Sequence, residues 1–153
     1  MDKTVIKIEN LFVELDGVSV LENVNLTVNE YDFLGIIGPN GGGKTTLLRV
    51  LLDLVKPVRG KIRIMGESLE KNRHLLGYVP QYAVFDRNFP ISVEEVVMSA
   101  RLARKQGRRF SHEDYKIAAA ALERVEILPL RSRQMGELSG GERQRVLVAR
   151  ALA

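Results

Sequence analysis

Residues 38–45 have the composition and spacing of a loop that binds phosphate groups. The stretch is Gly-Pro-Asn-Gly-Gly-Gly-Lys-Thr, in which two glycines flank four residues and are followed by lysine and a hydroxyl residue. Glycines let successive backbone N–H groups point into one small volume, and the N-terminus of a following helix adds more of them. The Lys44 ammonium would pair with the β- and γ-phosphates of a nucleotide, and the Thr45 hydroxyl would be a hard oxygen ligand for Mg²⁺. The alternative, a glycine-rich turn before a buried helix, gives no reason for lysine and threonine to follow in this register.

Residues 138–144, Leu-Ser-Gly-Gly-Glu-Arg-Gln, form a second candidate anion site. Ser139 is a favourable N-cap, and Gly140 and Gly141 leave backbone N–H groups uncovered at the start of a helix that we expect to run through Leu152. By itself this pattern is more simply an ordinary helix cap. Its meaning therefore depends on the rest of the chain.

Hydrophobic patterning predicts the elements that position the first loop. Residues 5–15 alternate loosely and predict a strand, Asp16-Gly17 is a hairpin turn signal, and residues 20–28 predict the return strand. Residues 33–37, Phe-Leu-Gly-Ile-Ile, are apolar throughout, as expected for a buried parallel strand that enters the loop. Residues 45–54 predict a helix that leaves the loop. It is apolar on nearly every side, so we expect it to pack on both sides.

The remaining chain predicts two further strands, over residues 61–65 and 76–79, and then a change to helices. Helices are expected over residues 92–106 and 111–125, since each begins with a serine followed three residues later by an acidic residue, as in a capping box.

A basic cluster ends the first of these helices. Solvated cations at a helix C-terminus are the simplest explanation, and contact with acidic groups of a partner or with lipid headgroups is the alternative. Nucleic-acid binding is disfavoured because no aromatic residues are interleaved with the cations. The cluster consists of Arg101, Arg104, Lys105, Arg108 and Arg109.

Composition limits the possible classes of protein. The chain has 153 residues, 45% hydrophobic and 27% charged, with a net charge of +4, which is ordinary for one soluble globular domain. It contains no cysteine and only two histidines, His74 and His112, far apart in polar segments. A disulfide framework and a thiolate or histidine metal site are therefore not expected. No signal peptide or long apolar run is visible, so we expect a cytoplasmic location.

The order of these motifs resembles that of the ATP-binding subunits of ABC transporters along the whole chain. Residues 38–46 resemble the Walker A loop, Gln81 in Tyr-Val-Pro-Gln resembles the Q-loop glutamine, and residues 138–144 resemble the ABC signature. The resemblance implies an α/β fold: a P-loop NTPase core over residues 1–82, with an N-terminal antiparallel β element, and a helical subdomain over residues 83–153.

The resemblance also implies an ATPase that energises a membrane transporter, with ATP and Mg²⁺ as cofactors. Lys44 and Gln81 would be catalytic, and Thr45 and Gln81 would contact Mg²⁺. ATP would be bound in one subunit by Gly38, Pro39, Asn40, Gly41, Gly42, Gly43, Lys44, Thr45 and Thr46, and would be capped by Ser139, Gly140, Gly141 and Glu142 of a second copy arranged head to tail. The other implied partners are transmembrane permease subunits on the inner face of the membrane and, indirectly, a substrate-binding protein. No nucleic acid is implied.

Residues 78–86 and 89–93 look most like the subfamily that serves zinc, manganese or iron uptake. Two alternatives remain open. One is a soluble ABC-type ATPase that acts in DNA repair or on ribosomes, although this chain lacks the long coiled-coil insertion or the second cassette typical of those proteins. The other is a non-catalytic nucleotide-binding remnant.

The chain also departs from the family pattern. The family's Walker B strand, which ends in Asp-Glu, would lie beyond Ala153, so we expect an incomplete central sheet, poor solubility, weak Mg·ATP binding and negligible hydrolysis for residues 1–153 alone. Leu15 occupies the position of the usual adenine-stacking aromatic residue, and the nearby Phe12 is out of register. Tyr31 stands at a turn position where the family usually has Gly. Gly42 stands at a loop position where the family often has Ala.

Overall fold

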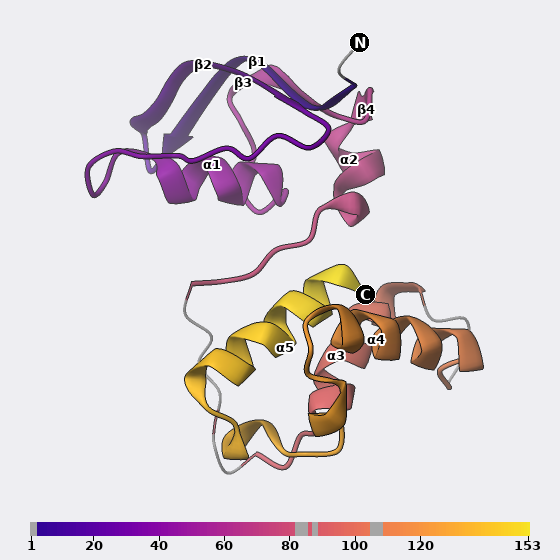
Figure 1. Ribbon diagram of the computed structural model, residues 1–153. Helices are drawn as coiled ribbons and strands as arrows, with labels where there is room; N and C mark the ends of the chain where they lie inside the picture. The colour runs from indigo at the N-terminus through magenta and orange to yellow at the C-terminus, as the bar shows by residue number, and fades with distance from the viewer. Residues whose placement is uncertain (1–2, 82–85, 87–88, 105–108) are drawn as a thin grey trace. The chain divides into compact units, whose positions relative to one another are not determined.

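The computed structural model describes residues 3–81, 86, 89–104 and 109–153. The chain forms two compact units, Met1–Leu76 and Gly77–Ala153, which we call the sheet unit and the helical unit (Figure 1). The boundary between the units lies at Leu76, whereas the family resemblance placed it after residue 82.

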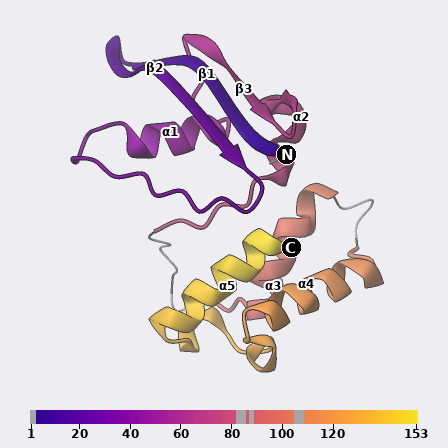
Figure 2. The same ribbon diagram turned by 45° about the horizontal axis from the view of Figure 1, so that its top comes forward.

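The sheet unit is built on a four-stranded antiparallel sheet with the strand order β2-β1-β3-β4. Figure 2 shows β2, β1 and β3 side by side in this order. Strands β1 and β2 form the hairpin expected from the sequence. Their turn places Asp16 at φ 51° and Gly17 at φ 76°, the left-handed backbone that a two-residue hairpin turn needs. The strands are β1 (Thr4–Leu15), β2 (Val18–Asn29), β3 (Arg59–Ile64) and β4 (Glu67–Ser68).

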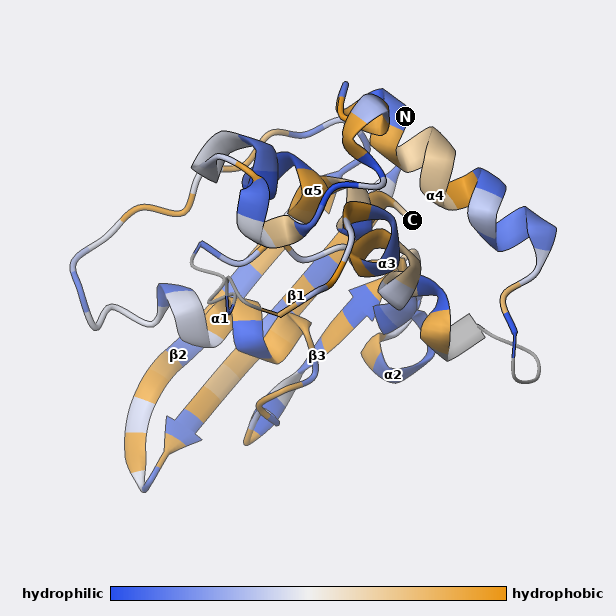
Figure 3. Ribbon diagram, turned by 90° about the horizontal axis from the view of Figure 1, so that it is seen from below, coloured by the Kyte–Doolittle hydropathy of each residue, from blue (hydrophilic) through white to orange (hydrophobic). Residues whose placement is uncertain are grey.

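One face of this sheet is covered by helix α1 (Lys44–Leu51), which begins directly after the glycine loop (Figure 1). Hydrophobic and hydrophilic residues alternate along much of β1 and β3 (Figure 3). A register shift in β1 between Ile8 and Leu11 keeps both side chains in the core. The same core takes in Leu21, Leu47, Val50, Ile62 and Ile64.

Helix α1 is shorter and less buried than its sequence predicts. It ends at Leu51 rather than Leu54, and Asp53 then takes a left-handed backbone with φ 60°. Only one face is buried, while Leu48 and Leu54 are exposed. The expectation of packing on both sides is therefore wrong for the described structure, because the sheet covers only one side of the helix.

The segment that enters the glycine loop is not a strand. Residues 33–37 have no regular secondary structure and belong to neither the sheet nor a helix, so the prediction of a buried parallel strand is wrong for the described structure. Phe33 is fully exposed and Ile37 is 94% exposed. An apolar strand is buried only when other elements flank it on both faces. The strand expected over residues 76–79 is likewise absent, and these residues form an irregular connection.

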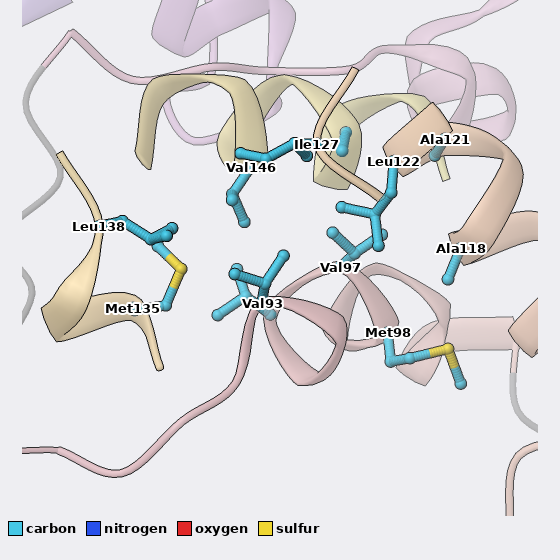
Figure 4. Close-up of a cluster of buried hydrophobic side chains, with 12 residues drawn as sticks. Val93, Val97, Met98, Ala118, Ala121, Leu122, Ile127, Met135, Leu138 and Val146 are labelled. Carbon is cyan, nitrogen blue, oxygen red and sulfur yellow. The ribbon is translucent and has the colours of Figure 1, made fainter. Parts of the chain in front are cut away.

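The helical unit packs three helices around one apolar core (Figure 4). Val93 and Val97 of α3 lie opposite Val146 of α5, beside Leu122 of α4 (Figure 4). These helices are α3 (Val93–Met98), α4 (His112–Arg124) and α5 (Gly140–Leu152).

Short helical turns complete both units. In the sheet unit they are α2 (Leu69–Asn72) and η1 (Arg73–Leu75), and in the helical unit η2 (Ser99–Arg104), η3 (Leu128–Leu130) and η4 (Met135–Glu137). Across the described ranges, no helix is long and apolar enough to cross a bilayer.

All three helices of the helical unit begin with a capping box, in which a serine and the acid three residues later satisfy each other's backbone N–H groups. The boxes at α3 and α4 confirm the predicted helix starts. The first helix is α-helical only to Met98 and continues as η2, and residues 105–108 lie outside the described part of the chain. The pairs are Ser92 with Glu95, Ser111 with Asp114, and Ser139 with Glu142.

Arg101 belongs to the basic cluster that the sequence predicts at this helix end. Its side chain is buried, and its Nε donates to Asp114 Oδ1 at 3.0 Å. The expectation of a solvated cation is therefore wrong for Arg101. Lys105 and Arg108 of the same cluster lie outside the described residues.

We predict that Tyr31→Gly stabilises the protein. Tyr31 has φ 70° and is 97% exposed, so it has the strain of a left-handed backbone without burying its ring. Relief of that strain should exceed the entropy cost of glycine and raise the free energy of unfolding by about 1 kcal/mol. Chemical denaturation measures the gain. Tyr31→Phe keeps the strain and should change nothing, whereas an unchanged or lower stability of Tyr31→Gly would contradict the explanation.

We also predict that the helical unit loses stability in acid. Hydrogen bonds from the Ser111 hydroxyl and backbone, and then Arg101, lower the pKa of Asp114 below its usual 3.8. Since the folded-state pKa is the lower one, the stabilisation is complete above the usual pKa and is lost as the pH falls through the folded value. Urea unfolding followed by circular dichroism should show a decline below about pH 4. Asp114→Asn should flatten this decline. An equally steep decline in that variant would contradict the role of the Asp114 carboxylate.

Candidate functional site

The glycine loop lies between the end of β2 and the start of α1. The turn after β2 is fixed because Asn29 N donates to Asp32 Oδ2 at 2.7 Å and Asp32 N donates to the Asn29 carbonyl at 3.1 Å. From this turn residues 33–37 lead to Gly38. The loop is therefore anchored by the sheet on one side and by α1 on the other.

Gly43 is the N-cap of α1 and cannot be another residue without a rearrangement. Its φ is 76°, and a Cβ there would lie 2.5 Å from Leu21 Cδ2 and 3.0 Å from the Val20 carbonyl oxygen. The start of the helix thus packs directly on β2. Gly41 has a similar φ of 80°, but a Cβ at that position would have nothing within 4 Å.

Gly42 lies against the turn of the loop itself. Its N–H donates to the Pro39 carbonyl at 3.2 Å, and a Cβ at this position would lie 3.1 Å from the same oxygen. This contact is tighter than most Cβ contacts. Glycine at position 42, where the family often has alanine, therefore suits this conformation of the loop.

Lys44 points back across the loop. Its Nζ donates to the carbonyl oxygens of Gly38 at 2.8 Å and of Pro39 at 2.6 Å. A full positive charge is thus held at the mouth of the loop, close to the N-terminus of α1, where the backbone N–H groups of the first turn have no partner within the helix. This arrangement of charge and N–H groups attracts an anion.

The two threonines after Lys44 differ in burial. Thr46 is buried among the core residues of α1, whereas Thr45 is exposed next to the loop. Among the described residues, no group of three or more acidic or histidine side chains gathers where it could hold a metal ion. The exposed Thr45 hydroxyl is a hard oxygen of the kind that Mg²⁺ prefers, and Gln81, the other residue expected to contact the ion, lies in the helical unit.

The second loop is a capped but open helix start. Ser139 Oγ accepts from Glu142 N at 3.3 Å, and Glu142 Oε2 accepts from Ser139 N at 2.7 Å. The side chain and then the backbone of Ser139 hold the pKa of Glu142 below its usual range. Cβ atoms built on Gly140 and Gly141 would meet nothing within 4 Å, so both glycines are uncovered.

The residues expected to act together belong to different units. Residues 38–46 lie in the sheet unit, and Gln81 and Ser139–Glu142 lie in the helical unit. Gln81 is exposed. The resemblance assigns Gly38, Pro39 and Asn40 to nucleotide binding; Gly38 and Pro39 contact Lys44 through their carbonyls, and Asn40 is exposed at the tip of the loop.

Leu15 and Phe12, the two residues near the family's adenine-stacking position, both lie on β1. Leu15, at the usual aromatic position, is half-buried at the end of β1. The ring of Phe12 is covered by the guanidinium of Arg59, whose Cζ lies 3.9 Å from the ring centre. Sequence reasoning missed this pair because the two residues are adjacent only through the pairing of β1 with β3.

Comparison with known proteins places these motifs in one family. Residues 21–153 match the family model described as ABC transporter. The manganese transport system ATP-binding protein MntA of Synechocystis sp. is 40% identical over 157 residues, covering 95% of this chain and 60% of that protein. The high-affinity zinc uptake system ATP-binding protein ZnuC of Bacillus subtilis is 41% identical, covering 88% of this chain and 59% of that protein.

Solved structures agree with this placement. MJ1267, an ATP-binding cassette of an ABC transporter in its ADP conformation, has a TM-score of 0.82 at 26% identity over 97% of this chain and 64% of its own. The protein cbiO1 from Clostridium perfringens, part of the ABC transporter complex cbiONQ, has a TM-score of 0.81 at 28% identity over 99% of this chain and 62% of its own.

The chain therefore spans about 60% of the length of the curated relatives it matches. The fold is the α/β fold of ABC ATPases, with an antiparallel N-terminal sheet and a helical part. With the family match over residues 21–153 and the ordered glycine and signature loops, this chain belongs to the ATP-binding proteins of the ABC transporter family.

Proposed function

We propose that this protein is the ATP-binding and ATP-hydrolysing subunit of a metal-ion importer. The observation that carries the proposal is the Lys44 ammonium, held by two loop carbonyls at the start of α1 beside an exposed Thr45. The named functions of the manganese and zinc relatives support the metal cargo. The transported metal itself would be handled by other subunits.

Binding of a nucleotide begins with an exchange of partners at Lys44. The ammonium would exchange its hydrogen bonds to the carbonyls of Gly38 and Pro39 for bonds to the β- and γ-phosphate oxygens. The N–H groups of the loop and of the first turn of α1 bind the remaining oxygens, helped by the helix dipole. Thr45 and Gln81 would contact Mg²⁺, which neutralises phosphate charge when bound.

The second loop serves the nucleotide of a second copy. Ser139, Gly140 and Gly141 present uncovered backbone at the N-terminus of α5 and would cap the γ-phosphate held by the partner. Glu142, whose carboxylate accepts from Ser139 N in the capping box, would shape this loop and face the partner's nucleotide with it. Gln81 would link the site to the transmembrane permease on the inner face of the membrane, and a substrate-binding protein would deliver the metal.

Hydrolysis is proposed for the whole subunit. For residues 1–153 alone we expect weak Mg·ATP binding, because the segment that leads into the loop has no strand beside it and exposes Phe33 and Ile37. Ordering this unpaired segment when the loop binds a ligand would cost conformational entropy.

We predict that Lys44→Ala abolishes the activity of the subunit. Loss of the charge that stabilises the transferred phosphoryl group should lower the ATPase rate by about 100-fold or more, as removal of one preorganised donor does elsewhere. ATP binding should weaken as well. The measurement is phosphate release at saturating Mg·ATP.

Lys71→Ala is the matched control, since Lys71 is an exposed lysine of the same unit in a surface ion pair with Glu67. It should retain the native rate within about twofold. A Lys44→Ala variant that releases phosphate at the native rate would refute the proposed site.

Alanine variants of Gly43 and Gly41 separate the effect of packing against β2 from the effect of backbone strain. Gly43→Ala and Gly41→Ala impose the same left-handed strain, but only the first brings a Cβ against β2. We predict that both weaken ATP binding and that Gly43→Ala lowers the free energy of unfolding by about 1–3 kcal/mol more than Gly41→Ala. Calorimetric titration and chemical denaturation measure the two effects. Equal losses of stability would show that Gly43 does not pack as described.

A further inference from the structure

The geometry points to Asp53 as a positioning residue that ties the segment leading towards Gln81 to the end of helix α1. This inference rests on the proposed function, in which α1 begins at the phosphate-binding Lys44 and Gln81 contacts Mg²⁺. No motif singled out Asp53, and the sequence pattern placed it inside the helix expected over residues 45–54.

Asp53 stands at a position where helices usually end in glycine. Helix α1 closes with a Schellman turn, in which Asp53 N donates to the Val50 carbonyl at 3.0 Å and Leu54 N donates to the Arg49 carbonyl at 2.9 Å. The turn needs a left-handed backbone at position 53, and Asp53 has φ 60°. This backbone is strained for a residue with a Cβ, although less for aspartate than for most. Such strain is an observation from which a role for the side chain can be inferred.

The Asp53 carboxylate is nearly buried and binds two cations. Its side chain is 10% exposed. Oδ1 accepts from Lys56 Nζ, and Oδ2 accepts from Arg73 Nη1 at 3.3 Å. The hydrogen bond and charge of Lys56, and then the charge of Arg73, outweigh burial and hold the pKa of Asp53 below its usual 3.8. Since both cations are largely exposed, these pairs add little stability, and their main consequence is the placement of the groups that they join.

Arg73 begins η1, the last helical turn of the sheet unit. Its carbonyl accepts from Leu76 N at 3.0 Å, so the end of this turn is attached to Arg73. Leu76 packs against the core of the sheet unit, and Asn72 Nδ2 donates to the Ile64 carbonyl at 3.0 Å. These contacts attach residues 72–76 to the sheet, and the pair with Asp53 attaches them to α1.

Helix α1 therefore has a contact relevant to the proposed function at each end. Lys44 is its first residue, and Asp53 lies two residues beyond its last. The eight residues of α1 span about 12 Å at 1.5 Å per residue. A short helix moves as one rigid element, so a shift of its start on phosphate binding would reach Arg73 through the carboxylate. Gln81 follows five residues after Leu76, where the chain leaves the sheet unit.

Glycine can replace the backbone of Asp53 but not its carboxylate. Asp53→Gly should keep the Schellman turn, because glycine is the favoured residue there, and should release both cations. Asp16→Gly is the matched control. Asp16 has the same type of backbone, with φ 51°, in the turn between β1 and β2, and its side chain is exposed. The two variants separate the loss of the carboxylate from the gain of a glycine.

The direct test is amide hydrogen exchange of the whole subunit without nucleotide, followed residue by residue by NMR. In Asp53→Gly the Leu76 amide should exchange at least about fivefold faster, while the Leu54 amide stays as protected as in the native protein. Asp16→Gly should change neither amide. Unchanged exchange at Leu76, or an equal loss of protection at Leu54, overturns the inference.

The functional readout is a split between nucleotide binding and turnover. Asp53→Gly should bind Mg·ATP within about twofold of the native affinity, since residues 38–46 are untouched, and should lower kcat by about fivefold or more, given the sensitivity of catalysis to misplaced groups. Arg73→Ala should lower kcat by a similar factor, and the double variant should lose no more than either single one, because both changes remove the same contact.

Equal losses of binding and kcat in Asp53→Gly, or additive losses in the double variant, overturn the positioning role. If the native subunit binds no ATP, the proposed function fails, while the exchange at Leu76 still decides whether Asp53 holds η1 to α1.

Discussion

The Lys44 ammonium and the two carbonyls that it contacts are the interaction on which the site depends. The hydrogen bonds from Lys44 to the carbonyls of Gly38 and Pro39 hold a positive charge against the loop. Phosphate oxygens bear full negative charge and are stronger acceptors than peptide carbonyls, so they can take over the ammonium without unfolding the loop. The loop therefore holds a positive charge where the phosphate groups would bind.

This position of the charge depends on how α1 sits on the sheet. The helix can begin at Lys44 only because Gly43 takes a left-handed backbone against Leu21 and Val20 of β2. Thr46, Leu47 and Val50 then fix the rotation of α1 on the core, which leaves Thr45 facing outward. The packing of α1 on the sheet thus determines the side of the helix on which Lys44 and the Thr45 hydroxyl face the loop.

The sequence predicted the elements whose conformation depends on neighbouring residues in the chain. The Asp16-Gly17 turn, the capping boxes at Ser92 and Ser111 and the glycine loop depend on residues close in the chain, and all three types of element form as expected. The roles assigned to the loop residues stay predictions.

The errors share a physical cause. Three expectations were wrong: the burial of residues 33–37, the packing on both sides of α1 and the solvation of Arg101. Each depends on which elements from distant parts of the chain lie alongside, and a local pattern of apolar or charged residues does not contain that information. The Phe12–Arg59 pair was missed for the same reason, since it requires the register of β1 with β3.

Amide hydrogen exchange of the whole subunit with and without Mg·ATP tests the central claim most directly. If loop amides and the start of α1 bind phosphate oxygens, the N–H groups of residues 41–46 should exchange at least about tenfold more slowly with nucleotide, while those of β3 should not change. Unchanged exchange at residues 41–46 under saturating Mg·ATP would contradict the account.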